Sequence, residues 1–99
     1  MLNIQKKQEE AKLTVALEGR LDTFTSADLQ KELDGSLTGI RELEFDLAKL
    51  EYISSAGLRL LLSAQKTMDR QGAMVVKHVP DAVRDIFEVT GFDGILKIE

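Results

Sequence analysis

Hydrophobic and polar residues alternate in three stretches of the first half of the chain, at residues 2–4, 13–17 and 43–47. A period of two predicts strands that have one buried face. Only residues 8–10 connect the first two stretches, so we expect these strands to form an antiparallel pair. Two further short hydrophobic stretches, at residues 73–76 and 95–98, predict a fourth and a fifth strand.

Spacings of three and four residues between hydrophobic positions predict three helices. In the first helix, Leu29, Leu33 and Leu37 share one stripe, and we expect the helix to end near Leu33 or Leu37. Thr25, followed by Asp28 three residues later, has the spacing of a capping box. This first helix is therefore expected to begin at Thr25.

The second helix has the strongest helical pattern of the sequence. It follows two serines, and it is expected to end at residues 70–72, where a basic residue and a glycine form a common stop signal. Its predicted inward stripe consists of Leu58, Leu61, Leu62 and Met68.

The third helix is expected to begin at residues 80–81 and to end at residues 90–91, with Val83, Ile86 and Phe87 pointing inward. The predicted order is therefore β-β-α-β-α-β-α-β. Strands separated by whole helices cannot form hairpins, so we expect an α/β fold with a small mixed sheet and helices packed on it.

The composition narrows the class of protein. A length of 99 residues predicts one domain over residues 1–99. A net charge of −4 and a pI of about 5.0 argue against direct nucleic-acid binding, which needs clustered Lys and Arg. The absence of cysteine excludes disulfides and thiolate metal sites. The opening residues are polar and no apolar run reaches the roughly 18 residues of a bilayer span, so we expect a cytoplasmic protein without membrane insertion.

Groups for catalysis are scarce. His78 is the only histidine, and no paired nucleophile or second metal ligand accompanies it. Residues 91–94 lack the lysine and the spacing of a phosphate-binding loop. The carboxylates of residues 42–46 alternate with hydrophobic residues, which is typical of a solvated strand face. We therefore expect no enzyme activity, no cofactor and no metal site.

Ser54 and Ser55 directly precede the second helix, and their pattern has two interpretations. A serine at this position caps a helix, because its oxygen accepts a hydrogen bond from a backbone N–H of the first turn. A phosphoserine is stabilised by the same free N–H groups and by the positive end of the helix dipole. Phosphorylation would add about −1.5 to −2 charges to a small apolar tip formed by Ala56, Gly57 and Leu58.

Three motifs, together with the order of elements, resemble the STAS domain found in bacterial anti-sigma factor antagonists. They are Gly19-Arg20-Leu21-Asp22, the block from Tyr52 to Arg59 that follows Asp46-Leu47, and Thr90-Gly91-Phe92. The resemblance spans nearly the whole chain, and the block around the serines is its most specific part. It implies a STAS-type single domain with a phosphorylated serine at the start of the second helix.

The resemblance also implies a function in transcription regulation. The partner would be an anti-sigma factor that is itself a serine kinase. The unmodified domain binds this partner and frees the sigma factor, phosphorylation switches the binding off, and a serine phosphatase restores it. The rival interpretation is a STAS subunit that docks permanently in a membrane transport or lipid-trafficking assembly and needs no phosphorylation.

The family's Asp-Ser-Ser/Thr-Gly-Leu pattern falls on residues 54–58, which makes Ser55 the predicted phosphoacceptor and Ser54 the second choice. Ser54 replaces the family's aspartate, and Ala56 replaces its second hydroxyl residue. Asp22 matches a family aspartate that lies near the acceptor and supports phosphorylation or partner contacts. The predicted partner-binding surface consists of Asp22, Thr23, Ser54, Ser55, Ala56, Gly57, Arg59 and Leu60.

Two hydrophobic residues near this surface have two interpretations each. At about 100° per residue, Leu60 lies more than about 90° from the centre of the inward stripe. It is therefore either exposed beside Ser55 or buried on a broad helix face. Phe24 either packs into the core beneath the first helix or sits at the mouth of the Asp22 loop, and we expect core packing.

Overall fold

Four strands form one mixed sheet in the computed structural model of the chain, which describes residues 1–99. Strand β1 (Leu2–Glu9) pairs antiparallel with β2 (Lys12–Leu21), as the short connection predicts. Strand β3 (Glu42–Ile53) lies parallel to β2, and β4 (Ala73–Lys77) lies parallel to β3. Because β1 extends to Glu9, the turn comprises residues 10–11 rather than the predicted residues 8–10.

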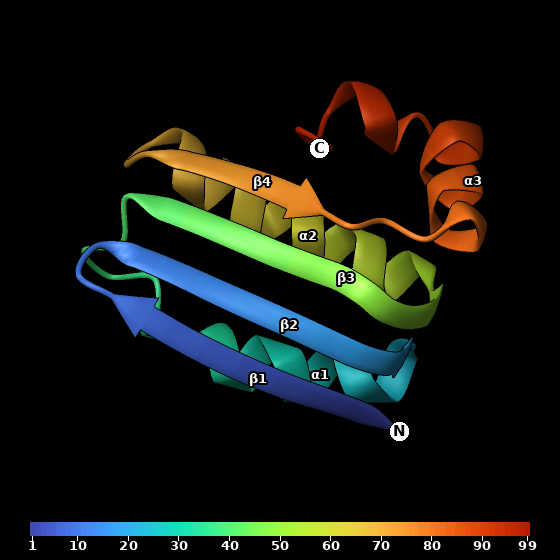
Figure 1. The fold of residues 1–99 in the computed structure, drawn as a ribbon, viewed down its shortest axis with the longest axis horizontal. Coiled ribbons are helices and arrows are strands. Elements are labelled where there is room, and N and C mark those ends of the chain that lie inside the picture. The colour runs from blue at the N-terminus through green and yellow to red at the C-terminus, as the bar shows by residue number, and fades with distance from the viewer.

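Helices α1 (Thr23–Leu33) and α2 (Ser55–Asp69) cover one face of the sheet and lie behind the strands in Figure 1. Helix α3 (Asp81–Thr90) and the short 3-10 helix η1 (Phe92–Gly94) follow β4 and lie beyond its end. Strands β2, β3 and β4 point to the same end of the sheet, and α1 and α2 begin there (Figure 1). The predicted α/β fold with a small mixed sheet is confirmed.

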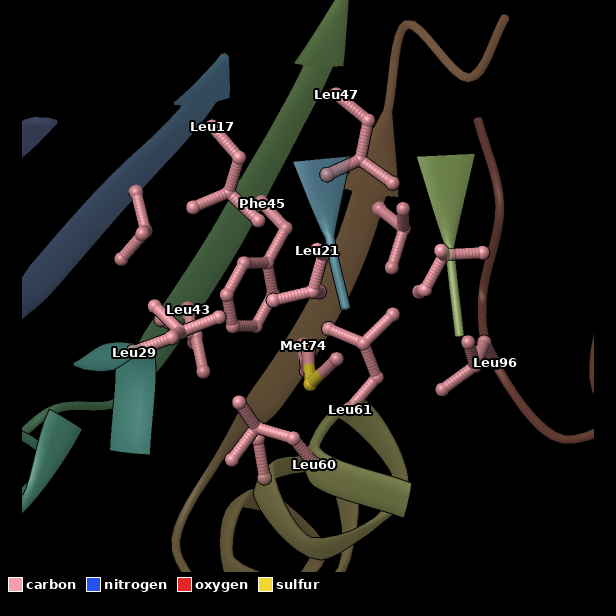
Figure 2. Packing of buried hydrophobic residues seen from close by; sticks show 14 of the residues in the cluster. Leu17, Leu21, Leu29, Leu43, Phe45, Leu47, Leu60, Leu61, Met74 and Leu96 are labelled. Carbon is pink, nitrogen blue, oxygen red and sulfur yellow. The ribbon is translucent and has the colours of Figure 1, made fainter. Parts of the chain in front are cut away.

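The core lies between the sheet and helices α1 and α2. Alternate residues of the two central strands are fully or almost fully buried, namely Leu13, Val15 and Leu17 on β2 and Leu43, Phe45 and Leu47 on β3. Leu29 of α1 and Leu61 of α2 pack against them (Figure 2). Each buried leucine contributes roughly 1.5–3 kcal/mol relative to an exposed one, so this layer holds both helix starts in place.

Strand β3 is longer than its alternating pattern indicates. The sequence predicts a loop through Leu50 and Ile53, but the strand continues to Ile53. Two register shifts in the pairing with β2 each insert one extra residue of β3. Such bulges break the period of two, so that Leu47, Leu50 and Ile53 are all buried although they are three residues apart.

The prediction of a last strand at residues 95–98 is wrong. Only Ile98 forms a bridge, parallel to Val76 of β4. The backbone N–H groups of Ile95 and Leu96 both donate to the Phe92 carbonyl, so the turn uses them and they are not free for a strand ladder. The observed order of helices and strands is β-β-α-β-α-β-α, followed by the 3-10 turn.

Candidate functional site

The connections from β2 to α1 and from β3 to α2 lie side by side at the end of the sheet (Figure 1). The Ser54 backbone N–H donates a 2.8 Å hydrogen bond to the Leu21 carbonyl, which joins the two connections directly. Asp22 follows Leu21, and Ser55 follows Ser54. The structure therefore brings together two segments that are separated by about 30 residues in the sequence.

Ser54 is the N-cap of α2. Its backbone is extended, and its Oγ accepts a 3.3 Å hydrogen bond from the Gly57 N–H. Its carbonyl accepts the first helical hydrogen bond, from the Leu58 N–H at 2.9 Å. Since the Ser54 side chain is half-buried and already occupied, the capping interpretation of the serine pair applies to Ser54.

Ser55 is the first residue of α2, and it is exposed. Its hydroxyl does not cap the helix, because the side-chain cap of α2 comes from Ser54. Ala56 beside it is half-buried, and Arg59 one turn further along is exposed. The serine pair therefore divides into one structural and one accessible hydroxyl.

Gly57 lies beneath this surface rather than on it. It is buried, and a Cβ atom at this position would lie 2.8 Å from both Ile53 Cγ1 and Leu21 Cγ. Neither atom is the free end of a flexible side chain, so a larger residue would push α2 away from the sheet. Gly57 thus permits the close approach of α2 and does not present a side chain to a partner.

The interpretation of Leu60 as an exposed residue beside Ser55 is wrong, and the broad buried face is confirmed. Leu60 is only 7% exposed, whereas Leu62, assigned to the inward stripe, is half-exposed. The reason is that α2 packs against α1 as well as against the sheet, and Leu60 lines the hollow between the two helices. Figure 2 shows Leu60 and Leu61 together in the buried cluster.

Asp22 is the N-cap of α1. The helix begins at Thr23, two residues before the predicted start at Thr25. Its Oδ1 accepts from the Phe24 N–H at 3.0 Å and from the Thr25 N–H at 2.9 Å. The Asp22 N–H donates to Thr25 Oγ1 at 2.8 Å, which completes the box. These donors favour the ionised carboxylate, above all the Thr25 N–H, so the pKa of Asp22 is lowered.

Phe24 does not pack into the core. It is 85% exposed on the first turn of α1, two residues after Asp22, and the exposed Thr23 stands between them. The predicted core packing is therefore wrong, and Phe24 lies at the mouth of the Asp22 turn. Hydrophobic periodicity does not predict the exposure of Phe24. The Asp22 cap sets where α1 begins, and this start determines which face of the helix Phe24 occupies.

The sequence does not reveal a contact between an arginine and an aromatic ring at this end of the sheet. The Arg20 guanidinium lies 4.4 Å from the centre of the Tyr52 ring, within the range of a cation–π interaction. Arg20 and Tyr52 are cross-strand partners on β2 and β3. A strand register is needed to find such a pair, and the two bulges of β3 conceal it in the sequence.

The remaining polar groups form no evident reaction centre. His78 is exposed, and its Nδ1 lies 3.1 Å from Asp46 Oδ1 on the uncovered side of the sheet. No group of three or more His, Cys, Asp or Glu side chains is placed to hold a metal ion. None of the helices is long and apolar enough to cross a membrane.

Comparison with known proteins identifies the family of this chain. A family model described as Mlab, STAS domain, matches residues 4–97. The chain belongs to the STAS domain family. Within it, the protein named "Putative anti-sigma factor antagonist BtrV" of Bordetella bronchiseptica is 35% identical over 88 residues, which cover 87% of this chain and 76% of that protein. Anti-sigma factor antagonists are non-enzymatic regulators, so the expectation that this STAS domain is not an enzyme is confirmed.

Solved structures agree with the STAS fold. An anti-sigma factor antagonist from Mycobacterium paratuberculosis superimposes with a TM-score of 0.89 at 19% identity, covering 99% of this chain and 85% of the other. Unphosphorylated SpoIIAA gives a TM-score of 0.85 at 15% identity, covering 98% and 88% of the two chains. The phosphorylated form of SpoIIAA from Bacillus gives 0.77 at 14% identity, covering 98% and 91%. At these identities, the agreement concerns the fold.

Proposed function

We propose that this STAS domain is an anti-sigma factor antagonist that is switched by phosphorylation of Ser55. The unmodified domain binds an anti-sigma factor with serine kinase activity and thereby frees a sigma factor. The kinase transfers the γ-phosphoryl group of ATP to Ser55 Oγ, and ADP and the hydroxyl proton leave. A serine phosphatase hydrolyses the phosphate and restores the binding form.

The observation that carries this proposal is the division of roles between the two serines. Ser54 Oγ is occupied as the cap of α2, whereas Ser55 is an exposed residue without a capping role. A kinase must reach the hydroxyl that it modifies, which favours Ser55. The antagonist name of BtrV and the existence of SpoIIAA in unphosphorylated and phosphorylated forms support the same mechanism.

The proposed docking surface lies around the joined helix starts, where Thr23, Phe24, Ser55 and Arg59 are exposed and Asp22 and Ala56 are half-buried. Ala56 is small, so a partner can approach the start of α2 closely. A phosphate placed there adds about −1.5 to −2 charges at the centre of this surface. We infer that the charge disrupts binding without refolding the domain, because Ser55 has no structural contact to lose.

The test is phosphorylation by the serine-kinase anti-sigma factors of the source bacterium, followed by mass spectrometry of the intact protein and its peptides. One phosphate on Ser55 is the expected result. Ser54→Ala is the matched control and is expected to accept the phosphate normally, whereas Ser55→Ala accepts none. A phosphate on Ser54 of the unaltered protein would overturn the assignment.

A second candidate function is that of a STAS subunit that docks permanently in a membrane transport or lipid-trafficking assembly. The observation in its favour is that Thr23, Phe24 and Arg59 are exposed in the unmodified chain, so this surface can dock without a phosphate. Both candidates use the same exposed surface, and they differ in whether Ser55 carries a phosphate. Absence of phosphate under all growth conditions, together with normal partner binding by Ser55→Asp, would favour permanent docking.

A further inference from the structure

Arg59 stands one helical turn after Ser55 on α2, and both residues are exposed. Side chains four residues apart in a helix are neighbours, with about 5–6 Å between their Cβ atoms. Helical side chains also lean toward the N-terminus of their helix. The long Arg59 side chain is therefore within reach of a group attached to Ser55 Oγ.

Arg59 has no competing partner in the structure. None of the salt bridges includes it. The first turn of α2 contains no acidic residue that could pair with Arg59, and Ser55 is the only residue of that turn with a hydroxyl group. An unpaired guanidinium at this position is free to bind an anion that arrives on the same helix face.

We propose that Arg59 binds the phosphate of phosphorylated Ser55 within the same helix, so that modification also withdraws the Arg59 cation from the docking surface. The inference rests on the proposed function, since it takes Ser55 as the acceptor. Guanidinium groups bind phosphate through two parallel N–H···O bonds. The phosphate would lie on the N-terminal side of Arg59, and this order of anion and cation along a helix is the more stabilising one.

This contact changes what the docking surface offers to a partner. In the unmodified domain, Arg59 is an exposed positive charge one turn from the small Ala56. In the phosphorylated domain, the guanidinium is engaged and the net charge of the pair is negative. A partner that pairs a carboxylate with Arg59 thus loses an attractive contact and meets a repulsive one at the same step, which makes the switch sharper than either effect alone.

The test uses protein with phosphoserine incorporated at position 55 during translation, so it needs neither a kinase nor a partner. The second pKa of the phosphate, ordinarily about 6, is measured by 31P NMR titration. A positive charge about 4 Å away in water lowers it by about 0.7 unit. Arg59→Gln is therefore expected to raise this pKa by about that amount, and Arg59→Lys to raise it less.

Arg70→Gln is the matched control. It removes the same charge from the other end of α2, about 22 Å along the helix from Ser55, where the charge is screened. Because Arg59 and Arg70 are both exposed, neither substitution is expected to destabilise the domain. Measuring the unfolding temperature of each variant checks that it is folded. The proposal is overturned if Arg59→Gln shifts the phosphate pKa no more than Arg70→Gln does.

Failure of this inference and failure of the proposed function give different results. If the phosphate pKa does not depend on Arg59 but the bacterial kinase modifies Ser55, only the intrahelical contact is wrong. If the pKa depends on Arg59 but no kinase of the source bacterium modifies Ser55, the contact between Arg59 and the phosphate is correct and the proposed switch is wrong.

Discussion

Replacing either serine by alanine separates the cap of α2 from the accessible hydroxyl. Ser54→Ala removes the acceptor of the Gly57 N–H, whose 3.3 Å bond is the only side-chain cap of this helix. Loss of a serine cap costs about 0.5–2 kcal/mol and typically about 1 kcal/mol. Ser55→Ala is expected to change the free energy of unfolding by less than about 0.5 kcal/mol, as exposed substitutions usually do.

Thermal unfolding followed by circular dichroism measures this difference. At this size, a loss of about 1 kcal/mol lowers Tm by about 4–8 °C, so Ser54→Ala is readily distinguished from Ser55→Ala. Ser54→Asp keeps a capping oxygen and is expected to retain the Tm of the unaltered protein. The division of roles is refuted if Ser55→Ala lowers Tm as much as Ser54→Ala does.

Three further predictions concern packing, charge and the exposed aromatic residue. Gly57→Ala is expected to lower the free energy of unfolding by about 1–3 kcal/mol in a urea titration, because a Cβ atom there overlaps buried side chains. The lowered pKa of Asp22 means that its contribution to stability is present above the ordinary aspartate value of 3.8 and is lost as the pH falls through the lower folded value. The acid-induced fall in Tm should therefore be smaller in Asp22→Asn. Phe24→Ala is expected to weaken partner binding at least tenfold in a calorimetric titration, whereas Val89→Ala, which removes an equally exposed residue on α3, leaves it unchanged.

The strands and the helix centres follow from periodicity in the sequence. Leu13, Val15 and Leu17 alternate with polar residues and are all buried, as predicted. The capping serine and the αL glycine at position 91, with φ of 79°, also stand where local chemistry predicts a helix start and a helix end. These features depend on neighbouring residues, so a single sequence contains them.

Two of the three errors concern features that depend on how the helices and strands pack together, and the third concerns which residue caps α1. Leu60 is buried because α1 lies beside α2, and a stripe calculated for one helix cannot include a neighbouring helix. Phe24 is exposed because Asp22, rather than Thr25, sets the start of α1. Leu50 and Ile53 continue a strand because bulges in β3 change its period. For Leu60 and for the end of β3, the deciding contact joins residues that only the fold brings together.

The candidate site is partly predictable from the sequence for the same reason. The serine pair and Asp22 are visible as motifs and carry the family resemblance. Their proximity depends on the hydrogen bond from the Ser54 N–H to the Leu21 carbonyl, which requires parallel pairing of β2 and β3. The assignment of the cap to Ser54 likewise requires the position of its Oγ. The sequence therefore predicts Asp22, Ser54 and Ser55 as candidate residues, whereas the burial of Gly57 and Leu60 and the exposure of Phe24 require the structure.

The central claim is that a negative charge on Ser55 switches off partner binding, and calorimetric titration of Ser55→Asp and Ser55→Ala against the serine-kinase anti-sigma factor tests it most directly. A charge about 4 Å from a like charge costs roughly 4 kcal/mol at an effective dielectric constant of 20. The account predicts about a thousandfold weaker binding for Ser55→Asp and little change for Ser55→Ala. Equal affinities of the two variants for the anti-sigma factor would contradict it.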